Sequence, residues 1–190
     1  LASAIPNARI AHQPTRSGVP VGMWRAVGHS HHAFFKEGFI AELAHAAKTD
    51  PVAYRLKLLE GLPRHKAVLK RAAEAAGWGQ PLSAGTARGV AVNESFGSVV
   101  AQVVEVEMGP PNLSLRVRPP EGGASARERP VADAKQDGQP RVKRVVCAID
   151  CGTVVNPGIV VRQMESCIVF GLTAALWGRI DIVNGEVQQQ

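Results

Sequence analysis

The segment from Gly18 to Phe34, GVPVGMWRAVGHSHHAF, holds Arg25 in a glycine-flanked loop ahead of a predicted helix. A guanidinium group presents a planar fork of N–H donors, which suits a phosphate or the carbonyl groups of a cofactor. A surface arginine in a turn would have the same sequence around it. The pattern therefore leaves two interpretations of Arg25 open, a binding residue and an ordinary turn residue.

Three histidines, His29, His31 and His32, follow this loop and could suggest a metal site. They have no nearby cysteine or carboxylate at ligand spacing, and adjacent side chains diverge on a helix. We therefore expect Ser30 to be the N-cap of a helix with the histidines in its first turn, and no metal there.

The cysteines, Cys147, Cys151 and Cys167, are an odd number without the spacing of a disulfide framework. The first two do not form the C-x-x-C of a zinc knuckle or a redox pair. We expect buried free thiols.

The stretch from Cys147 to Gly178 joins a strand, a glycine loop and a helix that begins at Asn156-Pro157, an N-cap followed by proline at N1. This arrangement can present backbone N–H groups to an anion or a polar cofactor. It is also typical of a plain packing unit. The apolar residues at helical spacing predict one buried stripe, made of Val160, Met164, Cys167, Ile168, Gly171, Leu172, Ala175 and Leu176.

The remaining patterns predict an α+β fold. The predicted elements are helices at 32–47, 51–60, 63–76 and 157–177, mixed strands at 88–107 and 142–150, and a C-terminal hairpin at 179–189. A turn from Asn93 to Gly97 divides the first strand region, and Gly77 ends the third helix. Residues 109–140, dense in proline and glycine, predict a flexible insert.

The first three helices carry apolar stripes that predict a structural role only. The stripes are Phe35, Phe39, Leu43 and Ala46 on the first helix, Val52, Leu56 and Leu59 on the second, and Leu69, Ala72, Ala73 and Ala76 on the third. Nothing on these helices indicates chemistry.

The composition excludes some classes of function. Most of the net charge of +6 lies between Gly109 and Arg144, where no aromatic residue could stack on bases, so a solvated linker is favoured over nucleic-acid binding. No uninterrupted apolar run approaches the ~18–20 residues of a membrane helix. The first residues do not form a signal peptide. The sequence starts with Leu1, so we expect a piece of a longer polypeptide, and both a cytoplasmic and a periplasmic location stay open.

Four motifs, taken in order, resemble a known family. They are GVPVGMWRAVGHSHHAF, FIAELAHAAKTDPVAYRLKLL, RGVAVNESFGS and VVCAIDCGTVVNPGIVVRQMESCIVFGLTAALWGRI. Together they resemble the large subunit of the xanthine oxidase/aldehyde oxidase-type molybdenum hydroxylases, and most nearly the isoquinoline 1-oxidoreductase beta-subunit branch. The resemblance covers nearly everything except residues 109–140. It implies that residues 1–190 are part of a molybdopterin-binding catalytic domain, interrupted by that insert.

The resemblance also implies a cofactor and partners. The cofactor is molybdenum held by molybdopterin, in bacteria usually as the cytosine dinucleotide. The implied enzyme is an oxidoreductase that hydroxylates an aldehyde or an N-heterocyclic carbon with water as the oxygen source. Electrons would pass to iron–sulfur (2Fe-2S) clusters on a small partner subunit. The substrate would be a small aromatic compound or an aldehyde.

The resemblance assigns cofactor-binding roles to four residues. The WRAVGH segment is similar to a loop near the molybdenum end of the pterin, which implies that Arg25 and Gly28 lie near the cofactor or substrate. The RQMES segment is similar to a helix start whose glutamine faces the pterin, which implies Gln163 as a contact. For Glu165 the resemblance leaves two roles open, a supporting residue of the cofactor site and a buried structural carboxylate.

Departures from the family pattern leave an alternative open. Met23 stands where proline is usual, and Ser166-Cys167 where a glycine pair is common, which implies an altered approach of the cofactor. A glycine-rich motif expected upstream and the base glutamate expected downstream lie outside these residues, so the catalytic residue stays unknown. We expect the chain alone to be inactive. The alternative is a non-catalytic remnant or interaction domain that keeps the fold.

Overall fold

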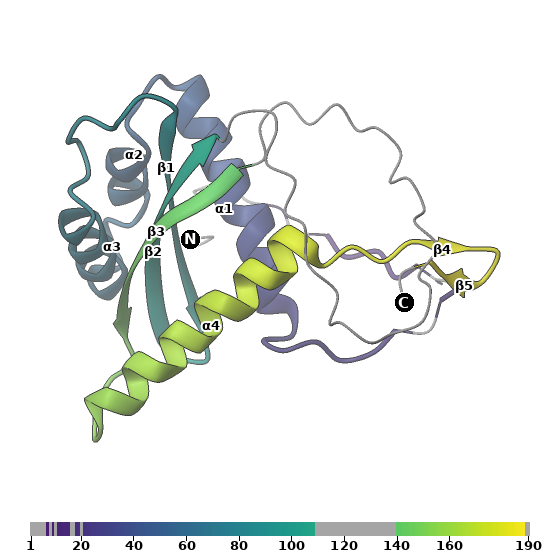
Figure 1. Ribbon diagram of the computed structural model, residues 1–190. Helices are drawn as coiled ribbons and strands as arrows, with labels where there is room; N and C mark the ends of the chain where they lie inside the picture. The colour runs from purple at the N-terminus through teal and green to yellow at the C-terminus, as the bar shows by residue number, and fades with distance from the viewer. Residues whose placement is uncertain are drawn as a thin grey trace, which may run out of the picture.

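The computed structural model describes residues 7, 9, 11–15, 18, 19, 21–108 and 140–188. Its elements, in chain order, are α1 (Gly28–Ala46), α2 (Pro51–Leu58), α3 (Pro63–Ala75), β1 (Thr86–Ser95), β2 (Ser98–Met108), β3 (Pro140–Asp150), α4 (Pro157–Trp177), β4 (Ile182–Val183) and β5 (Glu186–Val187). The α+β class is confirmed (Figure 1). The predicted insert, apart from its last residue, lies outside the described residues.

The sheet of β1, β2 and β3 is antiparallel throughout, with β2 in the centre. The sequence analysis predicted mixed strands, and the structure shows antiparallel ones. Only Phe96 and Gly97 connect β1 to β2, both with positive φ, at 49° and 79°. The observed turn is thus shorter than the predicted one, Asn93 to Gly97, because β1 continues through Ser95. The hairpin of β4 and β5 turns at Asn184-Gly185, as predicted.

Helices α2 and α3 cover one face of the sheet and form the core with it (Figure 1). Alternation along β2 places Val99, Ala101 and Val103 on this face, fully buried. The stripes predicted on α2 and α3 are confirmed, since they supply the rest of the core, which includes Val52, Leu59, Leu69, Ala72, Ala73 and Ala76.

Local capping explains where these helices begin and end. Asp50 accepts hydrogen bonds from the backbone N–H groups of Val52 and Ala53, directly before Pro51 at N1. Gly77, with φ of 65°, ends the helix region of α3, and Trp78 N–H bonds back to the carbonyl of Ala73. That pair of features is a Schellman motif, which confirms Gly77 as the terminator.

Helix α1 departs from the prediction in its start and in its buried face. It begins at Gly28 with Val27 as N-cap, and the Ser30 hydroxyl donates to the Val27 carbonyl, so Ser30 is not the N-cap. The buried residues are Glu37, Ile40 and Ala44, whereas Phe35 and Phe39 are each 61% exposed. Positions two apart lie ~200° around a helix, so burying Glu37 exposes Phe35. The predicted aromatic stripe therefore faces outward.

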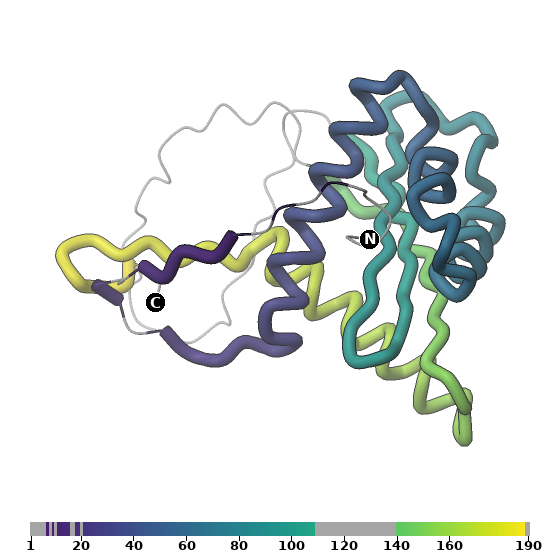
Figure 2. Tube along the Cα trace, turned by 180° about the vertical axis from the view of Figure 1, so that it is seen from behind, coloured from purple at the N-terminus to yellow at the C-terminus, as the bar shows by residue number. Residues whose placement is uncertain are grey.

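Helix α4 begins as predicted, with Asn156 accepting a hydrogen bond from Ile159 N–H ahead of Pro157 at N1. Its stripe is not buried as expected. Val160, Met164, Ile168 and Leu172 are half-buried, and the other members are exposed. The reason is that α4 crosses the molecule with few neighbours in the described part of the chain (Figures 1 and 2).

By length and mean hydropathy alone, α4 is long and apolar enough to span a membrane. None of its residues is fully buried. The predicted absence of such a segment rested on uninterrupted apolar runs. Here 21 helical residues include only two charged ones, Arg162 and Glu165. Buried helices of soluble proteins reach the same hydropathy, so this finding is weak evidence for a membrane.

Candidate functional site

The loop before α1 has a strained backbone. Ala26 and Val27 both have positive φ, at 68° and 50°, a conformation that a β-branched residue such as Val27 rarely adopts. Hydrogen bonds from Val27 N–H to the Trp24 carbonyl and from His29 N–H to the Ala26 carbonyl hold the turn. Strain of this kind costs about 1–3 kcal/mol and is concentrated at functional sites. Trp24 and Arg25 directly precede the two strained residues.

Both of these side chains lie against α4. Arg25 Nη2 donates to Cys167 Sγ at 3.6 Å, and the guanidinium carbon lies 5.5 Å from the centre of the Phe170 ring. The rings of Trp24 and Phe170 are 5.5 Å apart. The fold thus brings the predicted binding arginine to the helix that carries Gln163, although the two lie far apart in the sequence.

Gln163 shares a face of α4 with Cys167, because residues four apart are neighbours on a helix. Its side chain is exposed. Within the described ranges no hydrogen bond engages its amide, so both the donor and the acceptor of that group are available. Arg25 and Gln163 therefore flank one surface.

Glu165 and Gly28 are placed differently. Glu165 is exposed and lies ~200° around α4 from Gln163, on the opposite side of the helix. A Cβ added to Gly28 would lie 3.2 Å from the His32 ring, so this histidine fills the space beside the Gly28 backbone. The structure therefore brings Arg25 to the helix that carries Gln163 and places Glu165 on the other side of that helix.

The three histidines engage aromatic rings. The ring of His29 lies 5.0 Å from that of Phe96, and His31 contacts both His32 and Phe35. A shallow open hollow beside them is lined by Val27, Gly28, His29, His32 and Phe96. Among the residues that the structure describes, no three histidines, cysteines or carboxylates are grouped as metal ligands.

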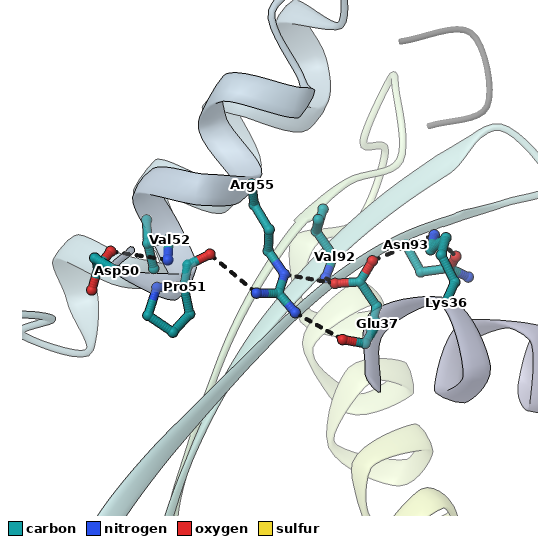
Figure 3. Close-up of polar contacts among 8 residues, drawn as sticks. All are labelled: Lys36, Glu37, Asp50, Pro51, Val52, Arg55, Val92 and Asn93. Carbon is teal, nitrogen blue, oxygen red and sulfur yellow. Dashed lines mark hydrogen bonds and ion pairs between the residues drawn. The ribbon is translucent and has the colours of Figure 1, made fainter. Parts of the chain in front are cut away.

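A buried ion pair, missed in the sequence, joins α1, α2 and β1 (Figure 3). Arg55 Nε donates to Glu37 Oε2 at 2.8 Å, and its Nη2 and Nη1 donate to the carbonyls of Glu37 and Pro51. Glu37 Oε2 also accepts from Val92 N–H. A signal existed, because Arg55 lies on the same face of its helix as Val52 and Leu59.

Polar groups continue outward from this pair. Lys36 Nζ donates to Asn93 Oδ1 at 2.6 Å and lies 3.7 Å from Glu37 Oε1, which is buried and accepts no hydrogen bond from the described residues. Burial lowers the pKa of Lys36. His65 Nε2 lies 3.1 Å from Glu94 Oε2, and burial likewise lowers the pKa of His65.

The C-terminal end of β3 is held by a bidentate ion pair. Arg64 Nε and Nη2 donate to the two carboxylate oxygens of Asp150 at 2.8 and 3.0 Å. This hydrogen bonding, together with the Gly152 N–H bond, lowers the pKa of Asp150 to about 2. The pair anchors the loop that leads from the sheet to α4.

The cysteines are less buried than predicted. Cys147 and Cys151 are half-buried and Cys167 is exposed, because α4 lacks a covering layer in the described part of the chain. Burial raises the pKa of Cys147, a hydrogen bond with Gln102 offsets part of this rise, and the nearby Cys167 thiol adds a smaller upward contribution. Cys147 alternates along β3 with Val146 and Ala148, which pack on the core, so its side chain lies on the other face of the sheet. Because Cys167 of α4 interacts with Cys147, α4 lies over that face, opposite α3.

Comparisons with known proteins bear on this arrangement. Residues 131–190 match the family model described as a molybdopterin cofactor-binding domain, which spans β3, α4 and the hairpin. The chain is 30% identical over 187 residues to the isoquinoline 1-oxidoreductase subunit beta of Brevundimonas diminuta, covering 97% of this chain and 21% of that protein. No solved structure matches the chain.

A second relative carries a different description. The chain is 28% identical over 182 residues to a protein of Gluconacetobacter polyoxogenes named membrane-bound aldehyde dehydrogenase, with pyrroloquinoline quinone in its name. The match covers 86% of this chain and 20% of that protein. The chain thus spans about a fifth of the length of the curated relatives it matches.

These findings confirm the resemblance that the four motifs predicted. Residues 131–190 resemble the molybdopterin cofactor-binding family, and the chain as a whole is similar to an isoquinoline 1-oxidoreductase subunit beta. Its likeness to the isoquinoline 1-oxidoreductase beta subunit extends over nearly the whole chain.

Proposed function

We propose that this chain forms part of the large subunit of a molybdenum-dependent oxidoreductase and supplies one wall of its cofactor site. The observation that carries the proposal is the contact between the Arg25 loop and α4. Helix α4 lies within the segment that matches the molybdopterin cofactor-binding family. Arg25 reaches that helix one turn from Gln163.

The two side chains suit the group proposed for them. Molybdopterin carries an anionic phosphate and a pterin edge with both donors and acceptors. Arg25 has one hydrogen bond among the described residues, to a thiol, which leaves its other N–H groups for a phosphate or carbonyl oxygen. The exposed amide of Gln163 can donate and accept toward the pterin edge. Arg25 and Gln163 would thus hold and orient the cofactor.

When bound, the cofactor would supply hydroxylation of an aldehyde or N-heterocyclic carbon with oxygen from water, and electrons would pass to iron–sulfur clusters of a small partner subunit. The name of the Brevundimonas relative supports an N-heterocyclic substrate, and that of the Gluconacetobacter relative supports an aldehyde. The cytosine dinucleotide form of the cofactor is part of this proposal. The residues of the chain orient the cofactor and exclude water from its bound face.

The exposed apolar surface supports a role within a larger subunit. The α4 stripe, the outward face of α1 with Phe35 and Phe39, and Trp177 leave a large apolar area uncovered in the described ranges. Monomeric soluble proteins rarely expose apolar patches larger than a few hundred Å². The relatives are about five times as long as the segment they share with this chain, which gives room for covering elements.

The test uses the full-length protein, expressed in a host that makes the cofactor, with molybdenum per polypeptide measured by elemental mass spectrometry. Gln163→Ala leaves the half-buried residues Met164 and Ile168 in place, so folding should be retained. An unpaired polar partner would weaken cofactor binding by about 1–3 kcal/mol, which is a loss of roughly fivefold or more in retention. Arg25→Lys should lower the content as well, because lysine lacks the planar fork.

Glu165→Gln is the matched comparison, since Glu165 lies on the opposite side of α4. A loss equal to that of Gln163→Ala would place the cofactor on both sides of the helix and support a binding role for Glu165. Normal molybdenum content in both the Gln163 and the Arg25 variants would return these residues to a structural role.

Two further outcomes separate the alternatives. Pyrroloquinoline quinone, extracted and quantified from the same samples in place of molybdenum, would favour the cofactor in the Gluconacetobacter relative's name. A full-length wild-type protein with neither cofactor would favour the non-catalytic remnant.

A further inference from the structure

We propose that Cys167 and Phe170 are positioning residues for Arg25, and that they fix its guanidinium on α4 before any cofactor binds. The inference rests on the proposed cofactor role of Arg25. Neither residue is itself proposed to touch the cofactor.

The contacts define the geometry. The Cys167 thiol lies 3.6 Å from Nη2 of Arg25, and the Phe170 ring lies beneath its guanidinium carbon at 5.5 Å. Cys167 and Phe170 are three residues apart and share one face of α4. The Trp24 ring packs against the same phenylalanine at 5.5 Å, so the backbone on the N-terminal side of Arg25 is held as well.

The chemistry of the two contacts suits a positioning role. A thiol is a weak hydrogen-bond acceptor and engages one of the five N–H donors of a guanidinium, which leaves the others for a ligand. The face of an aromatic ring attracts a cation without using any of these donors. Arg25 is thus oriented by groups that do not compete strongly with an anionic ligand. A long exposed arginine without them would sample many rotamers.

The strained turn supports the same conclusion. Ala26 and Val27, the two residues that follow Arg25, are held at positive φ, and the loop closes with hydrogen bonds to its own carbonyls. A strained turn persists where surrounding contacts over-determine it. Among the described residues, the contacts of Trp24 and Arg25 with α4 and the bond from the Ser30 hydroxyl to the Val27 carbonyl supply such restraint.

The first experiment tests the contact without any cofactor, on the 190-residue chain. Cys167 is modified in parallel by the dianionic disulfide reagent DTNB and by neutral iodoacetamide, and peptide mass spectrometry separates it from Cys147 and Cys151. A guanidinium beside the thiol attracts the anionic reagent only. Arg25→Gln should therefore lower the DTNB-to-iodoacetamide rate ratio at Cys167 by about twofold to fivefold, the effect of one charge at close range in water.

Arg162→Gln is the matched control, because it removes the same charge from the same helix away from Cys167. The ratio at Cys167 should then stay within experimental error, as should the ratio at Cys151 in all variants. An unchanged ratio at Cys167 in Arg25→Gln would overturn the contact and the proposal with it.

The second experiment measures molybdenum per polypeptide in the full-length protein. Phe170→Leu and Cys167→Ala should each lower the content severalfold, whereas Phe170→Tyr and Cys167→Ser, which keep a ring and an acceptor, should retain most of it. Val169→Ala, a neighbouring exposed position, should leave it unchanged. Circular dichroism of each variant checks that α4 is intact.

The two levels of the proposal fail differently. Unchanged molybdenum in Arg25→Gln would remove the proposed cofactor role of Arg25. A loss in Arg25→Gln, with normal content in both Phe170→Leu and Cys167→Ala, would overturn the positioning role alone.

Discussion

Replacing Arg55 by methionine would test the buried ion pair that joins α1 to α2 and to the sheet. Arg55 is 1% exposed and Glu37 is 6% exposed, so neither charge is hydrated. Methionine fills a similar volume but removes three hydrogen bonds, two of them to Glu37. The Glu37 carboxylate would keep the Val92 N–H bond and the Lys36 ammonium at 3.7 Å.

The expected loss follows from the uncompensated charge. Breaking a buried pair by removing one partner destabilises a protein by about 3–5 kcal/mol. The double variant Glu37→Met/Arg55→Met removes both charges of the buried pair. The main polar group that then loses its hydrogen-bond partner is the Val92 N–H group. An unsatisfied backbone donor costs about 1–3 kcal/mol. The double variant should therefore be more stable than Arg55→Met alone.

The assay is equilibrium unfolding in urea, followed by circular dichroism, at neutral pH. Arg71→Met on the exposed side of α3 and Glu42→Met on the exposed side of α1 are the matched controls, each expected within ~0.5 kcal/mol of wild type. An Arg55→Met loss below ~1 kcal/mol, or a double variant whose loss equals the sum of the single losses, would refute the reasoning.

Three further predictions concern stability. The folded pKa of Asp150 is about 2, below the ordinary 3.8, so its stabilisation is present above pH 3.8 and is lost as the pH falls through 2. The difference in Tm between wild type and Asp150→Asn should accordingly be present at pH 6, shrink below pH 3.8 and disappear only below about pH 2. Asp50→Ala removes two N-cap bonds and the bond from Trp78 Nε1, and should lower the free energy of unfolding by about 1–2 kcal/mol in urea titrations. Phe35→Ser with Phe39→Ser should change it by less than ~0.5 kcal/mol in this chain, because both rings are mostly exposed, and a loss above ~2 kcal/mol would show a buried face.

Local signals in the sequence determined most of the elements. Asp50-Pro51 and Asn156-Pro157 define helix starts because a side-chain oxygen satisfies free N–H groups and proline needs no donor there. Gly77 ends α3 because only glycine adopts positive φ without steric cost. The turn at Asn184-Gly185 follows from the same preference. These effects act within a few residues and need no partner from elsewhere in the chain.

Burial was decided by the tertiary structure. The stripe of Phe35, Phe39 and Leu43 was the most apolar face of α1, yet the structure buries the face with Glu37, because Arg55 and the Val92 N–H group meet it there. A periodicity shows that a helix has faces but not which neighbour each face meets. For α4 half of the predicted stripe is half-buried and the other half is exposed, since few elements in the described chain pack on it.

The candidate site shows the same division. The sequence itself identified Arg25 as an arginine in a loop and placed Gln163 on a helix after a capped start, and the resemblance gave both a cofactor role. That these residues share one surface depends on α4 crossing the sheet face opposite α3 and on the strained turn that directs Arg25 toward Cys167 and Phe170. Contacts between residues more than a hundred positions apart arise from packing, and no local pattern encodes them.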